Sequence, residues 1–180
     1  TRLVDNGTFV DNSEFAAILG MSRDGLLKDR AKRRKYGLPP ELRPAKLEDE
    51  SARNQPYFPV DWVNADITVT TVADQTPIAP GYKVSDVTNG GRRTARFVTE
   101  APILHFFSIQ SARYAEARAE HDGVQLSVFY HPPHQRNVER MLQAMRLSLE
   151  YYQPAFGPYQ FDQARIIEFP GYETFAQAFA

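Results

Sequence analysis

Apolar and polar positions alternate along the middle of the chain, and this alternation predicts β-strands. In ADITVTTV (65–72) every second side chain after Asp66 is Ile, Val or Thr, and β-branched residues predominate. The segments RRTARFVTE and ILHFFSIQSARYAEA predict further strands, the second of them long and apolar. In VQLSVFY, the side chains of Val124, Leu126 and Val128 share one face with the last tyrosine. This part of the chain is therefore expected to be rich in β-structure.

The segments between these strands have the composition of turns and sheet edges. NGG at 89–91 and DG at 122–123 are typical hairpin turns. DQTPIAPGYKV (74–84) contains two prolines and a glycine, and it predicts a loop or an edge strand because proline cannot donate a ladder hydrogen bond. Short strands at this spacing predict an antiparallel β-sandwich-like part or an open antiparallel sheet.

The apolar period changes after residue 131 and predicts a helix over 137–152. Apolar side chains in NVERMLQAMRLSLEYY recur every three or four positions. Asn137 is the expected N-cap, and Pro154 and Gly157 are expected to stop the helix. A strand is predicted at 165–169. The fold class is therefore mainly β with α: a β-sandwich-like N-terminal part followed by a strand–helix–strand unit.

The first third of the chain predicts less regular structure. LVDNGTFVDNSEF contains a short apolar stretch and an Asn-Gly turn. Residues 22–35 predict a short basic helix after Ser22, ended by Gly37 and the prolines that follow it. Residues 36–60 are rich in proline and charge and predict a long irregular connection.

Composition excludes several classes of function. The chain has 180 residues, 42% hydrophobic and 24% charged, as in an ordinary globular protein of one large domain or a domain and a half. Its net charge of −1 gives no overall attraction to nucleic acid or to an anionic membrane. The absence of cysteine excludes disulfides, Cys-ligated zinc, iron–sulfur clusters and thiol catalysis. No apolar run approaches the roughly 20 residues of a membrane helix.

The histidines are the first candidates for a site. His131 and His134 lie three positions apart, a spacing that can bind metal on a helix. Two prolines separate them, and no carboxylate stands at a recognisable ligand offset, so a polar linker between strand and helix is the favoured interpretation. His105, expected inside a strand, and His121, expected in a turn, do not indicate a site.

Two basic segments are the other candidates. The run from Lys28 to Lys35 could contact phosphates, but it lacks interleaved aromatic residues, and a solvated helix face is favoured. Arg92 and Arg93 follow the glycines of NGG, but the Gly-Lys-Ser/Thr of a P-loop is missing and a hairpin tip is favoured. GxSxG, HExxH and GxGxxG do not occur. From the residues we predict no catalytic and no metal site, and the substrate-binding residues stay unknown.

Several longer segments resemble a known family. NGTFV, DQTPIAPGY, GRRTARF, PILHFFSIQSARY, YHPPHQRNVERM and FGPYQFDQARIIEFPGYETFAQAF together resemble the M1-type aminopeptidase-like region of bacterial ABC-transporter permeases. The resemblance covers nearly the whole chain. It implies that residues 1–125 end the N-terminal β-domain and that residues 126–180 begin a thermolysin-like catalytic domain, with helix 137–152 and strand 164–169. It also implies a membrane-associated parent protein that binds zinc and hydrolyses peptides.

The chain departs from this pattern at its end. M1 enzymes carry Gly-x-Met-Glu-Asn after that strand and HExxH further on, and neither motif occurs here. Glu173 lies close to the expected position but outside any such motif, so it is assigned no role. We therefore expect a piece of a larger protein, without zinc and without peptidase activity, whose apolar edge at Phe175–Phe179 promotes self-association.

Two other interpretations stay open at this point. One is a non-enzymatic domain, a degenerate peptidase that binds peptides or partner proteins beside a transporter. The other is a stand-alone ligand-binding β-sandwich, which predicts a fully covered domain and is disfavoured by the apolar end.

Overall fold

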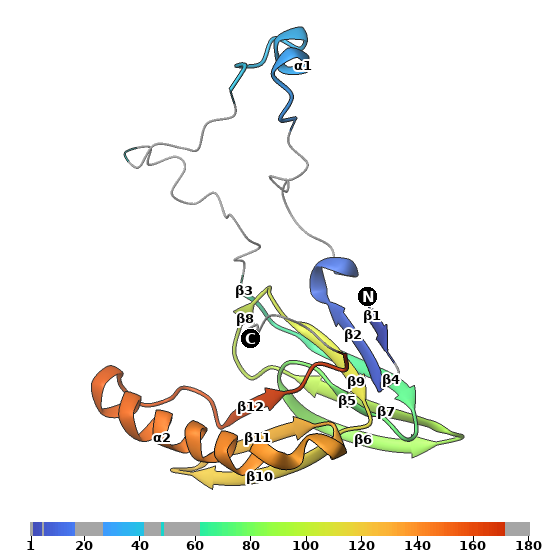
Figure 1. Ribbon diagram of the computed structural model, residues 1–180, viewed down its shortest axis with the longest axis vertical. Coiled ribbons are helices and arrows are strands. Elements are labelled where there is room, and N and C mark those ends of the chain that lie inside the picture. The colour runs from blue at the N-terminus through green and yellow to red at the C-terminus, as the bar shows by residue number, and fades with distance from the viewer. Residues whose placement is uncertain (1, 5, 17–26, 42–47, 49–61, 172–180) are drawn as a thin grey trace.

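A computed structural model describes residues 2–4, 6–16, 27–41, 48 and 62–171 (Figure 1). The Phe175–Phe179 edge and Glu173 lie outside the described residues. In chain order the elements are β1 (Arg2–Val4), β2 (Gly7–Asp11), the 3-10 turn η1 (Asn12–Glu14), α1 (Arg30–Lys35), β3 (Trp62–Val63), β4 (Asp66–Val72), β5 (Thr76–Ile78), β6 (Tyr82–Asn89), β7 (Arg92–Val98), β8 (Ile103–Leu104), β9 (Ser108–Ala112), β10 (Ala115–His121), β11 (Val124–Tyr130), the 3-10 turn η4 (Pro132–Asn137), α2 (Val138–Phe156) and β12 (Gln163–Ile167).

The N-terminal part consists of antiparallel sheets, as the alternation predicted. One sheet has the strand order β1-β2-β9-β5, a second has the order β4-β7-β6, and β3 pairs with β8. A cluster of buried side chains, Ala79, Ala95 and Phe97, packs with Ile67, Val69 and Ile109 and joins the first two sheets. Burial alternates along β4 as the sequence predicted, and the prolines of 74–84 lie in edge strand β5 and in the turn that follows it.

The NGG segment forms the hairpin turn between β6 and β7. Asn89 pairs with Arg92, and Gly90 and Gly91 have φ angles of +57° and +77°, which favour glycine. Arg93 forms an ion pair within this sheet: its Nε and Nη2 donate to the two carboxylate oxygens of Asp86 at 2.8 and 2.7 Å. The hairpin interpretation of these arginines is confirmed.

The long strand predicted over ILHFFSIQSARYAEA is wrong. The segment forms β8, β9 and β10, which belong to three different sheets. The first break is held by buried Asn12, whose side chain donates to the His105 carbonyl at 3.0 Å and accepts from the Phe107 N–H at 3.1 Å. His105 therefore lies after a strand, not inside one. A contact distant in sequence overrides the local apolar pattern here.

The strand–helix–strand unit is confirmed, and the structure adds its pairing. β11 pairs antiparallel with β10 and parallel with β12, in a register that places Val128 opposite Ile166. Helix α2 lies on one face of this sheet (Figure 1). Leu126 and Val128 are almost fully buried and pack with Val138 and Leu142 of the helix. The boundary predicted at 125/126 falls within β11 and stays a prediction.

The ends of both helices differ from the prediction. Helix α2 continues through Pro154, which removes only one backbone donor, and ends at Gly157 with φ +102°. Asn137 precedes the helix but makes no side-chain cap bond, because it closes the 3-10 turn η4. Helix α1 begins at Arg30, where the Asp29 carboxylate caps it by accepting from the Lys32 N–H at 2.7 Å. Of the helix predicted over 22–35, residues 27–29 are not helical and residues 22–26 lie outside the described residues. Residues 36–41 form no helix or strand; most of the rest of 36–60 lies outside the described residues.

Candidate functional site

A cavity of about 540 Å³ lies beside β12, within the size range of small-molecule sites. It is lined by the turn that follows β5, the start of β6, part of β9, and the approach to and length of β12. The lining residues used below are Gly81, Tyr82, Glu100, Gln110, Tyr159, Phe161, Asp162, Gln163, Arg165 and Phe169.

Three hydrogen bonds fix one wall of the cavity. Arg165 Nη2 donates to the Ala79 carbonyl at 3.1 Å, and Gln163 Nε2 donates to the Gly81 carbonyl at 2.9 Å. The Asp162 N–H donates to the Tyr82 hydroxyl at 2.9 Å. These contacts join the start of β12 to the turn between β5 and β6, across about 80 residues of sequence.

Gly81 permits the close approach that forms this wall. Its φ is +87°, and a Cβ atom there would lie 2.5 Å from the carbonyl carbon and oxygen of Val98. Any side chain would therefore press the turn away from β7.

The charged side chains that line the cavity are buried to different degrees. Burial lowers the pKa of Arg165, against the opposing field of Glu116, so its cation is poorly solvated. Glu100 and Asp162 line the same cavity and are exposed. Among the interactions of the described residues, none of these three side chains takes part in an ion pair. The cavity thus carries a partly buried positive group and two exposed negative groups.

Aromatic rings supply the apolar part of the lining. The rings of Tyr159 and Phe161 lie 5.7 Å apart, and Phe169 contacts Phe9 at 5.0 Å. Burial raises the pKa of the Tyr159 phenol, so this hydroxyl stays neutral at physiological pH.

Beside the cavity, Glu168 forms hydrogen bonds with three parts of the chain. Its Oε2 accepts from the His131 N–H at 2.6 Å, and its Oε1 is bonded to His134 Nδ1. Its backbone N–H donates to the Phe129 carbonyl at 2.9 Å, and its own carbonyl accepts from the Tyr114 hydroxyl at 2.6 Å. Glu168 therefore fixes the end of β12 to the end of β11 and to η4.

Tyr114 connects this network to the cavity. Its hydroxyl lies 3.1 Å from Gln110 Oε1, and Gln110 lines the cavity. Burial raises the pKa of the Tyr114 phenol, and the nearby charge of Glu168 adds to the effect.

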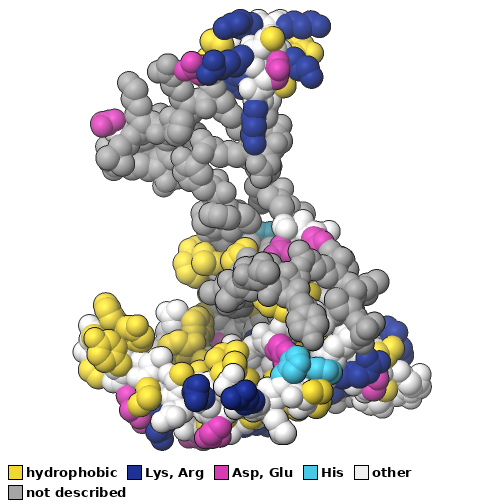
Figure 2. All heavy atoms as spheres, viewed as in Figure 1, with side chains coloured by type: hydrophobic (Ala, Val, Ile, Leu, Met, Phe, Trp, Pro, Cys, Tyr) yellow, Lys and Arg dark blue, Asp and Glu magenta, His cyan; other side chains and the backbone are white. Residues whose placement is uncertain are grey.

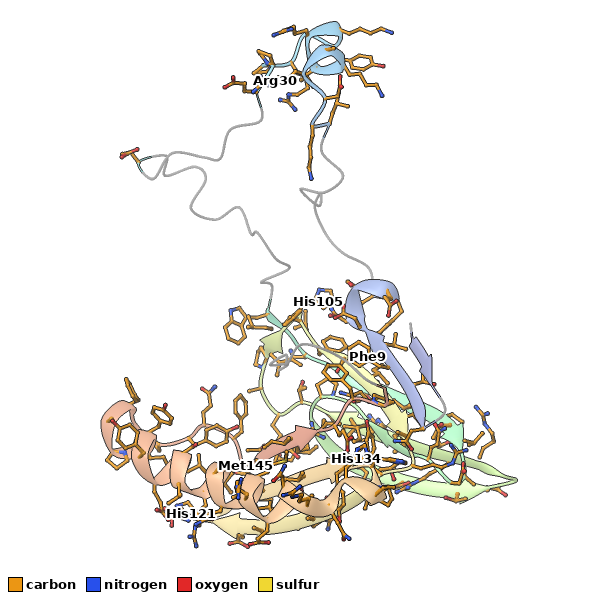
Figure 3. All side chains as sticks on the ribbon, in the orientation of Figure 1. Phe9, Arg30, His105, His121, His134 and Met145 are labelled. Carbon is orange, nitrogen blue, oxygen red and sulfur yellow. The ribbon has the colours of Figure 1, made fainter. Side chains whose placement is uncertain are left out.

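The side chains of His131 and His134 contact each other. The His131 and His134 rings meet edge to face, with their centroids 5.2 Å apart. His134 is labelled in Figure 3. Glu168, which completes this group, was missed because it is 34 residues from His134, and only the parallel pairing of β11 and β12 brings it there. No local spacing in the sequence signals that contact. His121, expected in a turn, is the last residue of β10 and lies 4.0 Å from Glu150 of α2.

These residues do not fit a zinc ion. His134 Nδ1 is engaged by Glu168, whose second oxygen accepts from a backbone N–H. Within the described ranges, no group of three or more His, Asp or Glu side chains has a metal-binding arrangement. Zinc needs three or four converging protein ligands, so no step through zinc is derived from this site.

The basic run is mostly a solvated helix face, as predicted. Arg33 is the exception: it is buried, and its Nε and Nη1 donate to the carbonyls of Pro39 and Leu27 at 2.6 and 2.9 Å. It therefore stabilises the turn after α1 and is not free to contact phosphate.

Solved structures with a similar fold include M1 zinc metallopeptidases. The chain is similar to the M1 zinc metallopeptidase from Deinococcus radiodurans, with a TM-score of 0.52, 17% identity and coverage of 64% of this chain. A substituted variant of that enzyme matches with a TM-score of 0.52 and 18% identity. In both cases the chain spans 28% of the metallopeptidase's length. No family profile and no curated protein matches the chain.

The chain thus has a mainly β fold with one α/β layer, and this fold resembles part of an M1 metallopeptidase. At this level of identity the likeness establishes the fold and leaves the activity open. No helix in the described parts of the chain is both long and apolar enough to cross a membrane.

Proposed function

We propose that the chain is a portion of an M1-type peptidase-like domain that, in its parent protein, is attached to an ABC-transporter permease. The observation that carries this proposal is the shared fold, which extends over 64% of this chain but 28% of the metallopeptidase. The sequence resemblance to permease-fused aminopeptidase-like regions supports the attachment. It also supports a membrane-associated parent.

We further propose that this chain by itself does not hydrolyse peptides. HExxH is not in its sequence, and the described histidines do not fit zinc. In the parent, zinc-dependent hydrolysis would need ligands supplied from other residues.

Turnover of aminoacyl-anilides tests this proposal. We expect the purified chain to release no anilide above the buffer rate, with or without added zinc. Turnover that a chelator abolishes would refute the proposal. The matched control is the Deinococcus metallopeptidase under the same conditions, because it shows that the assay detects an active M1 fold.

A non-enzymatic peptide- or partner-binding domain is the second candidate. It is favoured by the cavity beside β12, which is of ligand size but lacks a metal-binding group among its described residues. The sequence of the parent gene discriminates the two candidates. An intact HExxH with a distant glutamate favours the peptidase, and a disrupted motif favours the binding domain.

Self-association remains a separate proposal. Besides the predicted apolar edge, hydrophobic side chains gather over the C-terminal end of α2, where Tyr151, Tyr152 and Phe156 are 73%, 54% and 81% exposed (Figure 2). Light scattering coupled to size-exclusion chromatography measures the mass, and a monomer at high concentration would count against the proposal.

A further inference from the structure

We infer that helix α1 and the turn after it bind the surface of a membrane that contains anionic lipids. Lys32, Arg34 and Lys35 contact the lipid phosphates, and Tyr36 and Leu38 contact the boundary between headgroups and acyl chains. This inference goes beyond the proposed function, because attachment to a permease gives α1 no role of its own.

The first argument is the local charge of this segment. Residues 27–41 contain six basic and two acidic residues, although the whole chain has a net charge of −1. Asp29 caps the helix, and Glu41 forms an ion pair with the first residue of α1 at 3.6 Å. Lys32, Arg34 and Lys35 are exposed, and no ion pair is described for them. Cations of this kind are attracted to an anionic leaflet, each by a factor of about five in affinity.

The second argument is the apolar surface beside these cations. Tyr36 is 66% exposed and Leu38 is 43% exposed. Lys35 Nζ lies 6.0 Å from the centroid of the Tyr36 ring, and Lys32 is four residues before Tyr36, on the same side of the helix. At a membrane surface, aromatic and aliphatic side chains enter the interface while neighbouring cations stay at the phosphates. The segment presents both kinds of group together.

The third argument is the accessibility of α1. Figure 2 shows Lys and Arg side chains gathered over this helix. Among the described residues, every hydrogen bond and ion pair of α1 has its partner within 27–41. Arg33 binds the carbonyls of Leu27 and Pro39 on either side of the helix, so the segment is held together by its own contacts. A membrane can therefore contact the cations without breaking a contact to the sheets.

A lipid surface fits these features better than a nucleic acid does. Helix α1 has six residues and is therefore about 9 Å long. Its cations would reach about two or three phosphates of a fixed nucleic-acid backbone, which gives weak binding. Anionic lipids diffuse within the bilayer and can gather around a small group of cations. Leu38 gains from contact with acyl chains, whereas it offers no ring on which a base could stack.

Co-sedimentation with vesicles tests the inference on the unaltered chain. The probes are vesicles of phosphatidylcholine alone and vesicles with about 30% phosphatidylserine, at up to about 5 mM lipid and about 50 mM salt. We expect saturable binding to the anionic vesicles that is at least about tenfold tighter than to the neutral ones and is lost at about 0.5 M salt. Absence of binding to the anionic vesicles, or equal binding to both kinds, overturns the inference.

Substitutions assign the binding to α1. Lys32→Gln combined with Lys35→Gln should weaken binding to the anionic vesicles by about 20-fold, from the two lost cations. The matched control combines Arg136→Gln with Arg140→Gln, which removes the same charge from two exposed residues of η4 and α2 and should weaken binding by less than about threefold. Circular dichroism verifies that each variant folds. Equal losses in the two folded variants overturn the inference. If the α1 variant does not fold, the comparison of vesicles on the unaltered chain still decides the question.

Leu38→Gln and a nucleic-acid probe separate a lipid surface from other anions. Leu38→Gln should weaken vesicle binding by about threefold or more, because it removes an apolar contact with the interface. Full affinity of this variant overturns the interfacial contact. A labelled DNA duplex of about 20 base pairs, followed by fluorescence anisotropy in the same buffer, should bind more weakly than the anionic vesicles at equal phosphate concentration. Tighter binding of the duplex, lost with Lys32→Gln and Lys35→Gln, assigns the surface to nucleic acid and overturns the inference.

Discussion

Replacing Leu126 by alanine should destabilise the protein by about 2.5 to 5 kcal/mol. Leu126 is completely buried in β11, between the flanking strands β10 and β12 and under helix α2. The change removes about three methyl or methylene groups, worth about 0.8 kcal/mol each, or about 2.4 kcal/mol in transfer free energy. A residual cavity adds to this at about 24 cal/mol per Å³, so a void of roughly 60 Å³ contributes about 1.4 kcal/mol more.

Urea denaturation followed by circular dichroism measures this loss. The midpoint should fall while the slope stays constant, and the melting temperature should drop by roughly 6 to 12 °C. Leu147→Ala is the matched control, because Leu147 is the same residue type on α2 but is 49% exposed. Its loss should stay below about 1 kcal/mol. If both variants lose the same free energy, Leu126 does not form the core between α2 and the sheet.

Three further predictions follow from the contacts above. Asp86→Asn should lower the free energy of unfolding by about 1 to 2 kcal/mol at pH 7, because it weakens two charge-assisted bonds to its paired arginine. That arginine holds the pKa of Asp86 well below its usual range, so the stabilisation is complete above about pH 4 and is lost as the pH falls further. Urea denaturation between pH 7 and pH 3 should show the free energies of unfolding of the wild type and of Asp86→Asn converging. Asp66→Asn, which alters an exposed ion pair with Arg96, should change the free energy of unfolding little. Gly7→Ala should lower the free energy of unfolding by about 3 kcal/mol, because the added Cβ would lie 2.0 Å from the Ser111 carbonyl oxygen. Gly91→Ala is the control: its Cβ meets open space, and the same assay should show a loss of about 1 kcal/mol. Tyr114→Phe should lower the free energy of unfolding by about 1 to 2 kcal/mol, because it removes the hydroxyl that donates to the Glu168 carbonyl. Burial raises the pKa of the Tyr114 phenol above the usual value of about 10, so an alkaline absorbance titration of the variant should lack this late-ionising tyrosine. A titration identical to that of the wild type would contradict this.

The candidate site was less predictable than the strands that carry it. The sequence identified His131 and His134, and both lie in the connection between β11 and α2, as predicted. It did not identify Glu168, which bonds to both residues, or the environment of Arg165. Both contacts depend on how β12 pairs and where the β5–β6 turn docks, and neither is encoded in local spacing.

The break in the segment between Ile103 and Ala117 illustrates the same limit. Its apolar pattern predicted one strand, but Asn12 binds its backbone, and the chain passes through three sheets. Pairing between distant strands decides which short apolar runs become separate elements, because each element must bury its face against a partner.

The sequence by itself determined the alternation of the strand β4, the helical period of α2, the NGG and DG turns, and the change from antiparallel strands to a strand–helix–strand unit. These features depend on steric preferences and on side-chain alternation, which are local. Only the tertiary structure decided that β12 pairs parallel with β11, that Glu168 meets the histidines, and that Arg165 lines a cavity. Such contacts join residues far apart in the chain, and their geometry is fixed when the sheets and α2 pack together.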